Sequence, residues 1–179
     1  VIYGLVTVVS LSLLIPSVWL QEQMPELPNL VEEEFEGLMH SWLGFLAITI
    51  CAPIGEEVVF RGGILRSLLG QCDNKWVAIV LSAFLFSLAH FNPAQLPHTF
   101  LTGLLLGWIY MRSGSILLTV LYHWVNNTMA FIAGYYYGED AELVDMLGGH
   151  INVVAALFVS TVLLTESLRF LKKLLQPER

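Results

Sequence analysis

The run SWLGFLAITICAPIGEEVVFRGGILRS, residues Ser41–Ser67, is long and apolar and carries Glu56, Glu57 and Arg61 in its second half. A membrane-spanning helix needs about 20 mainly apolar residues, and this run exceeds that length. Ionisable groups inside such a run are costly to bury in lipid and indicate function by default. The stretch therefore predicts a membrane helix that carries part of a functional site.

Composition places the whole chain in a bilayer. Of its 179 residues, 56% are hydrophobic and 13% are charged, the mean hydropathy is +0.69 and the formal net charge is −7. Soluble domains carry about 25% charged residues, disordered chains have low hydrophobicity, and nucleic-acid-binding domains have a basic excess. These values exclude a disordered, collagen-like or nucleic-acid-binding chain, and the lipid bilayer is the partner that we expect.

Six apolar stretches predict an all-α fold, a polytopic membrane helical bundle with about six transmembrane helices. Besides Ser41–Ser67, the stretches are Val1–Leu20, Trp76–Phe91, Pro97–Met111, Ser115–Tyr137 and Ile151–Leu171. We interpret residues 1–179 as a single membrane-embedded domain.

Two alternatives stay open in this interpretation. Trp76–Phe91 and Pro97–Met111 are shorter than a full span, so they are either tilted neighbours in a thinned region or a hairpin that enters and leaves by the same side. Val1–Leu20 resembles the apolar region of a signal peptide, but it lacks a basic start and a small-x-small cleavage site. A span is therefore favoured for this first stretch.

The distribution of basic residues predicts the orientation. Every Lys and Arg except Arg61 lies on one side of the six-pass arrangement; these residues are Arg66, Lys75, Arg112, Arg169, Lys172, Lys173 and Arg179. Cytoplasmic segments carry an excess of Lys and Arg. We therefore expect an integral protein of the plasma (inner) membrane with both termini in the cytoplasm.

The ionisable residues of Ser41–Ser67 differ in whether the same helix offers them a partner for an ion pair. Glu57 and Arg61 are four residues apart, so on a helix they share a face and form an ion pair. Glu56 points about 100° away from Glu57 and has no partner three or four residues distant. Pro53 and Gly55, just before it, disturb the helix and permit close approach. Glu56 is therefore the candidate general base.

Polar residues on two further stretches complete the candidate site. His123 and Asn127 are four residues apart and share one helix face, and His90 ends the third stretch. A single buried histidine is more often a packing residue, but an unpaired Glu56 together with these groups favours one shared site. The remaining histidines are interpreted as structural residues at outer helix ends; these are His40, His98 and His150.

Three motifs in order carry a family resemblance. Glu56–Arg61 reads E-E-x-x-x-R, Phe86–His90 reads F-x-x-x-H, and His123–Asn127 reads H-x-x-x-N. They resemble the CAAX-protease and bacteriocin-processing (CPBP, or Abi) family of intramembrane endopeptidases. The resemblance covers about residues 52–127, including a G-x-x-x-G at Gly103 and Gly107 that we interpret as a helix-packing face.

The resemblance implies a catalytic core with its cavity open toward the cytoplasm. It implies that Glu56 and His90 activate a water molecule for attack on an amide, and that His123 and Asn127 stabilise the oxyanion. The Glu57–Arg61 pair would support them. The implied substrate is a membrane-tethered peptide, prenylated or bacteriocin-like.

The family has been described both as metalloproteases and as glutamate-type proteases. Glu56, His90 and His123 would supply three zinc ligands with an open fourth position, but H-E-x-x-H is absent from the sequence. Zinc-binding histidines also need acceptors behind them, and we assign Glu57 to Arg61. The sequence therefore favours catalysis without a cofactor, with zinc as the alternative.

Two other classes of function compete with the endopeptidase. One is a non-catalytic membrane protein, such as a bacteriocin-immunity factor or a scaffold, but every motif residue is intact. The other is a proton- or ion-coupled transporter that uses Glu56 and the histidines as a relay. Such transporters often show an internal repeat of broken spans, which this sequence lacks.

Overall fold

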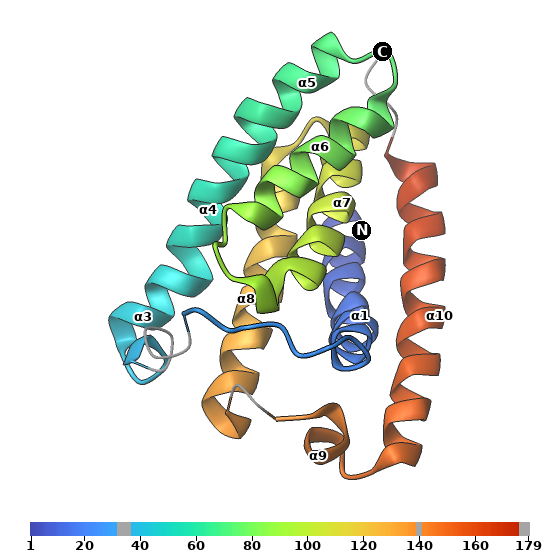
Figure 1. The fold of residues 1–179 in the computed structure, drawn as a ribbon. Helices are drawn as coiled ribbons and strands as arrows, with labels where there is room; N and C mark the ends of the chain where they lie inside the picture. The colour runs from blue at the N-terminus through green and yellow to red at the C-terminus, as the bar shows by residue number, and fades with distance from the viewer. Residues whose placement is uncertain (32–36, 139–140, 176–179) are drawn as a thin grey trace.

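A computed structural model of the chain describes residues 1–31, 37–138 and 141–175, and its regular structure over these ranges is helical (Figure 1). The all-α prediction is thus confirmed. The α-helices are α1 (Ile2–Glu22), α3 (Trp42–Leu46), α4 (Ala52–Glu57), α5 (Arg66–Gln71), α6 (Lys75–Leu88), α7 (Leu96–Ser113), α8 (Ile116–Tyr137), α9 (Leu143–Leu147) and α10 (His150–Leu174).

The prediction of about six membrane spans is wrong. Within the described ranges, four helical segments are long and apolar enough to cross a membrane, which are Ile2–Glu22, Trp42–Gln71, Ile116–Tyr137 and His150–Leu174. Helix α6 has 14 residues, or about 21 Å at 1.5 Å per residue, which is short of the roughly 30 Å hydrocarbon core. Helix α7 is long enough, but Pro97, His98 and Arg112 make it too polar. Four apolar helices indicate an integral membrane protein.

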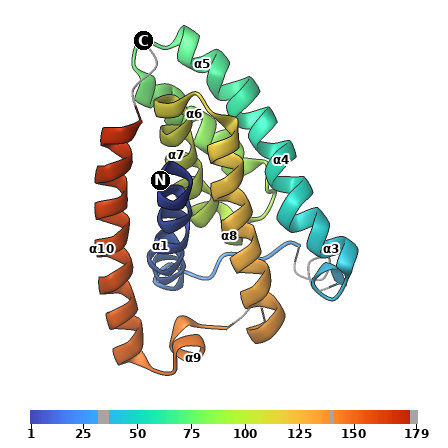
Figure 2. The same cartoon turned by 180° about the vertical axis from the view of Figure 1, so that it is seen from behind.

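The two short stretches instead form a helical hairpin, in which α6 and α7 lie side by side (Figures 1 and 2). Two glycines of α7 allow this close approach. A Cβ atom on Gly103 would lie 3.0 Å from the Cα of Ala83, and one on Gly107 would lie 3.0 Å from Cγ2 of Ile79. The predicted G-x-x-x-G packing face is confirmed, and it brings α7 against the site.

From Trp42 on, the apolar run Ser41–Ser67 belongs to one continuous helical rod, Trp42–Gln71, of 30 residues. Its α-helical pieces are joined by π-helical turns at Ala47–Cys51 and Val58–Leu65. Pro53 lies at the start of α4 and lacks an N–H group, so the regular bonding pattern is interrupted there. Such π-helical turns occur often at functional sites, and Glu56 lies midway along this rod.

The remaining helices pack around α1, which contacts α7, α8 and α10 (Figure 2). Their apolar core includes Val6, Leu106, Tyr122 and Leu171, all fully buried. At one end of the bundle, Nη2 of Arg112 donates hydrogen bonds to the carbonyl oxygens of Lys172 and Leu175, at 2.6 and 2.7 Å. These bonds fasten the end of α7 to the end of α10.

Candidate active site

Glu57 and Arg61 form a buried ion pair next to the hairpin. Oε1 of Glu57 lies 2.8 Å from Nη1 of Arg61, and neither side chain is exposed. Nη2 of Arg61 donates a hydrogen bond of 3.3 Å to the carbonyl oxygen of Gly103, and the guanidinium lies 4.4 Å from the ring centroid of Phe86. Arg61 thus connects the rod to both helices of the hairpin.

His123 is the second partner of Glu57. Its Nδ1 atom lies 2.9 Å from Oε1 of Glu57, and the imidazole is 4% exposed. Because an ionised carboxylate only accepts hydrogen bonds, Nδ1 carries the proton and Nε2 faces the other way. The sequence reasoning assigned Glu57 to Arg61 alone, and that assignment is wrong.

Glu56 faces both catalytic histidine candidates. Its Oε2 atom lies 3.8 Å from Nε2 of His123 and 4.0 Å from Nε2 of His90. This oxygen is buried and makes no hydrogen bond within the described structure, although the Glu56 side chain as a whole is 31% exposed. Three groups from α4, α8 and the turn after α6 therefore converge on one point.

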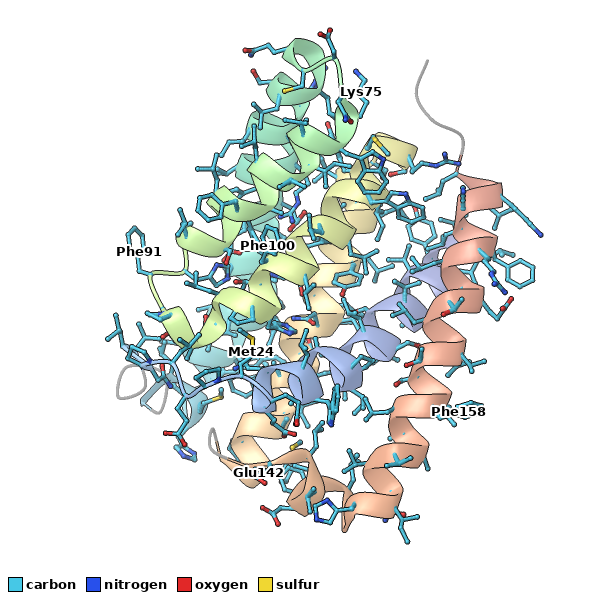
Figure 3. The ribbon with its side chains drawn as sticks, turned by 45° about the vertical axis from the view of Figure 1, so that its right-hand side comes forward. Met24, Lys75, Phe91, Phe100, Glu142 and Phe158 are labelled. Carbon is cyan, nitrogen blue, oxygen red and sulfur yellow. The ribbon has the colours of Figure 1, made fainter. Side chains whose placement is uncertain are left out.

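The turn after α6 sets the orientation of His90. Its Nδ1 atom lies 2.9 Å from the carbonyl oxygen of Phe86, so Nδ1 donates and Nε2 is left as an acceptor. The helix cannot continue because Phe91 adopts a left-handed φ of 51°. Figure 3 shows Phe91 at this turn, pointing away from the bundle. The side chain of Asn92 then accepts a hydrogen bond of 3.1 Å from the backbone N–H of Leu30.

Phe86 packs at the centre of the site, against the imidazoles and the guanidinium. Its ring is 1% exposed and packs edge-to-face against Phe60, His90 and His123, with centroid distances of 5.2, 4.9 and 5.7 Å. Together with the cation–π contact to Arg61, this explains why an aromatic residue precedes His90 by one helical turn.

Asn127 lies one turn beyond His123 on α8. Its Nδ2 atom donates a hydrogen bond of 3.0 Å to the carbonyl oxygen of Ile48, which belongs to the first π-helical turn. The structure thus brings Glu56, His90 and His123 together, while Asn127 is anchored to the rod. Its amide nitrogen carries a second hydrogen, which this bond leaves available.

Sequence reasoning set His98 aside as a structural residue at an outer helix end. In the structure, its Nδ1 atom lies 3.0 Å from Oγ of Ser17 and its Nε2 atom 3.4 Å from Nδ2 of Asn126. These three residues come from α1, α7 and α8. No spacing within one segment could have revealed this contact, because it depends on how three helices cross.

The three residues named as possible zinc ligands lie farther apart here than the ligands of a bound zinc ion. Two ligands on tetrahedral zinc lie about 3.3 Å apart, given bonds of about 2.0–2.1 Å, whereas Glu56 lies 3.8 and 4.0 Å from the two Nε2 atoms. Over residues 1–31, 37–138 and 141–175, no group of three or more His, Cys, Asp and Glu side chains is arranged to hold a metal ion. The Nδ1 atoms of His90 and His123 do have the acceptors that zinc-binding histidines use.

The sequence that builds this site matches a known protein family. A sequence profile described as "Type II CAAX prenyl endopeptidase Rce1-like" matches residues 38–129, which is just over half of the chain. The match includes all three motifs and both helices of the hairpin. No solved structure matches the chain significantly.

Three curated relatives share part of the sequence. An uncharacterized 24.3 kDa protein of Escherichia coli is 35% identical over 96 residues, 51% of this chain and 44% of that protein. The UPF0177 protein YbdI of Lactococcus lactis is 32% identical over 72 residues, 37% of this chain and 38% of that protein. CAAX prenyl protease 2 of Arabidopsis thaliana is 29% identical over 132 residues, 63% of this chain and 42% of that protein.

The chain thus spans less than half the length of each of these relatives. The family profile nevertheless covers more than half of this chain, and the family resemblance predicted from the three motifs is confirmed. The protein belongs to the Rce1-like family of type II CAAX prenyl endopeptidases.

Proposed function

We propose that this protein is an intramembrane endopeptidase that hydrolyses a peptide bond of a membrane-tethered substrate, with Glu56 as the general base. The observation that carries the proposal is the approach of Glu56 Oε2 to Nε2 of His90 and of His123, at 4.0 and 3.8 Å. Family membership implies a peptidase and supports this reaction class.

The donor and acceptor roles favour a water molecule between Glu56 and His90. Oε2 of Glu56 and Nε2 of His90 are both acceptors, since Nδ1 of His90 donates to the Phe86 carbonyl oxygen. A water molecule has two O–H donors, and two acceptors bonded to it at about 2.8 Å lie about 4.5 Å apart. The 4.0 Å between these atoms is close to that separation.

In the proposed reaction, this water attacks the carbonyl carbon of the scissile peptide bond. A C–O bond forms, the water proton passes to Glu56, and the carbonyl oxygen becomes an oxyanion. The oxyanion accepts hydrogen bonds from Nδ2 of Asn127 and from Nε2 of a protonated His123. Collapse then breaks the C–N bond, and Glu56 returns its proton to the leaving amine.

Glu57 supports this step by holding His123. Its carboxylate accepts the Nδ1–H bond, which fixes the ring so that Nε2 lies 3.8 Å from Oε2 of Glu56. Arg61 holds the Glu57 carboxylate in place through the pair at 2.8 Å. Glu57 and Arg61 are therefore positioning residues in this proposal, not groups that touch the substrate.

For the substrate we propose a membrane-tethered protein with a prenylated C-terminal peptide. The description of the family and the name of the Arabidopsis relative both refer to CAAX prenyl substrates. A bacteriocin-like leader peptide is the other substrate type that the sequence predicted, and the test below separates the two.

We further propose residence in the plasma (inner) membrane with both termini cytoplasmic. Four spans, like six, return the chain to its starting side, so the correction in span number leaves the expected orientation unchanged. Arg112 and the end of α10 lie together at one end of the bundle, as the positive-inside rule requires. Labelling of single cysteines from each side of sealed vesicles tests this orientation.

The test of the function uses purified protein in lipid vesicles with a lipid-anchored fluorogenic peptide. Wild type is expected to cleave it, and Glu56→Gln is expected to lose activity about 10²- to 10⁴-fold, the usual contribution of a general base. The prenylated peptide is expected to be cleaved faster than a bacteriocin-leader peptide with the same anchor. Retained activity in Glu56→Gln contradicts the proposal, and equal cleavage of both peptides contradicts the substrate class.

A further inference from the structure

A row of hydrogen-bonded polar side chains begins in α1, outside the segment that matches the family profile. We call it the Ser17 chain. Ser17, which is 2% exposed, donates its hydroxyl hydrogen to the carbonyl oxygen of Leu14 at 3.0 Å. The same oxygen lies 3.0 Å from Nδ1 of His98. Because the Ser17 hydroxyl hydrogen is already used, His98 Nδ1 is the donor in this contact.

The other side of His98 agrees with that assignment. Nε2 lies 3.4 Å from Nδ2 of Asn126, and an amide nitrogen only donates, so Nε2 must accept. One neutral tautomer of His98 therefore satisfies both neighbours. A histidine with both nitrogens engaged by separate helices is fixed in its orientation.

The chain continues from Asn126 to Asn127. Nδ2 of Asn126, which is 6% exposed, lies 3.5 Å from Oδ1 of Asn127. Nδ2 of Asn127 donates to the Ile48 carbonyl oxygen at 3.0 Å. The Asn127 amide is thus held at its oxygen by one neighbour and at its nitrogen by another, which prevents the flip that would exchange the two atoms.

We infer that His98 and Asn126 are positioning residues that hold the Asn127 amide in one of its two orientations, with Nδ2 kept as the donor that the proposed oxyanion site uses, through a hydrogen-bonded chain anchored on Ser17 of α1. This inference rests on the proposed function. An oxyanion is stabilised by donors that are already oriented before the reaction, whereas a flipped amide would present its oxygen and repel the charge. The chain therefore makes α1 a part of the catalytic arrangement.

The test is a double-mutant cycle between His98→Phe and Asn127→Ala, measured as kcat and KM on the lipid-anchored peptide. With Asn127 present, His98→Phe is expected to lower kcat about 10- to 100-fold, the usual effect of losing a residue that orients a functional side chain, with KM unchanged. With Asn127→Ala, it is expected to lower kcat no further. His98→Gln, which offers one acceptor and one donor, is expected to restore most of the activity.

An equal loss of kcat in both backgrounds, or an unchanged kcat in His98→Phe, overturns the inference. His150→Phe is the matched control, because His150 begins α10 and is not part of the Ser17 chain. If His98→Phe does not fold, Ser17→Ala tests the far end of the chain in the same cycle. Activity in Glu56→Gln removes the proposed function and this inference together, whereas an inactive Glu56→Gln with an additive cycle removes this inference alone.

Discussion

Glu56 and Glu57 are adjacent on one helix, yet their carboxylates lie in different surroundings. Glu57 is fully buried, and its Oε1 atom lies 2.8 Å from Arg61 and 2.9 Å from His123. Oε2 of Glu56 and Oε2 of Glu57 both lack a hydrogen-bond donor among the described residues, but Glu56 has no donor at its other oxygen either, and its side chain is 31% exposed. Since neighbouring helical positions differ by about 100°, one step along the chain separates the two environments.

This difference separates the two tasks that a hydrolytic site needs. A carboxylate that accepts hydrogen bonds from a guanidinium and an imidazole is held in one orientation. A carboxylate without donors is free to accept a proton from water, which is what a general base does. The identity of the residue is the same in both positions, so the packing around each one decides its role.

The largest effect is expected at His123, which touches both carboxylates. His123→Asn places an amide nitrogen near the position of Nδ1 and so keeps a donor for Glu57, but it removes Nε2. It should lower activity about 10³-fold, because the oxyanion loses a donor, while thermal stability in detergent changes little. His123→Phe removes both nitrogens and should lower stability as well.

Together, the two variants separate the role of the nitrogen that faces Glu57 from that of the nitrogen that faces Glu56. A fully active His123→Asn would show that Nε2 has no part in the chemistry. Equal stability of His123→Asn and His123→Phe would show that the 2.9 Å contact with Glu57 contributes little to the fold.

The next largest effect is expected on stability, at the buried ion pair of Glu57 and Arg61. Glu57→Gln removes the counter-charge that is hydrogen-bonded to the buried Arg61, so it should reduce the free energy of unfolding by about 3–5 kcal/mol. Glu56→Gln, one position away and half-exposed, should leave it unchanged. Thermal unfolding of both variants in the same detergent measures the difference.

A double variant distinguishes a lost ion pair from lost packing. Apolar residues of similar volume often replace a buried pair at little cost, so Glu57→Leu with Arg61→Met should be more stable than Glu57→Leu alone. It should nevertheless be inactive, because His123 loses its acceptor. A double variant less stable than the single one would contradict the charge argument.

Much of this comparison could be predicted from sequence, because it follows from spacing within one segment. The i, i+4 relation of Glu57 and Arg61 predicts their contact, which the structure has at 2.8 Å. The long apolar run around Glu56 predicts the membrane helix that the structure has at Trp42–Gln71. Both inferences use only the geometry of a single helix.

Contacts between different segments were harder to predict from the sequence. The bond from His123 to Glu57 depends on how α8 crosses α4, and that crossing leaves no mark on the sequence. The same holds for His98, whose partners lie on α1 and α8. The number of spans was wrong for another reason. Trp76–Phe91 and Pro97–Met111 are apolar enough to suggest membrane spans, but α6 is too short to cross the hydrocarbon core and α7 is too polar, and the two helices pair as a hairpin.

A smaller effect is expected where the hairpin supports the buried pair. Gly103→Ala would place a Cβ atom 3.0 Å from the Cα of Ala83 and 3.3 Å from the Phe86 ring, and the backbone cannot yield easily. We expect a cost of about 1–3 kcal/mol in unfolding free energy, together with reduced activity, since the Gly103 carbonyl oxygen also accepts from Arg61.

Gly55→Ala is the control on the Glu56 side of the comparison, because a Cβ atom there would meet no atom within 4 Å. Alanine also favours a helix more than glycine does, so Gly55→Ala should be neutral or slightly stabilising. Thermal unfolding compares the two glycines directly. Equal losses in both would mean that space on the hairpin face does not limit the packing.

The smallest effect is expected from a metal chelator. Glu56, His90 and His123 are spaced at 3.8 and 4.0 Å, wider than the about 3.3 Å between ligands of tetrahedral zinc, and we assign the gap to water. Activity should therefore be unchanged after prolonged dialysis against chelator. The opposite result, activity lost and restored by zinc alone, would change the comparison, because Glu56 would then be a zinc ligand and Glu57 the acceptor that orients another ligand, His123. The bond between His123 and Glu57 would be needed in either case.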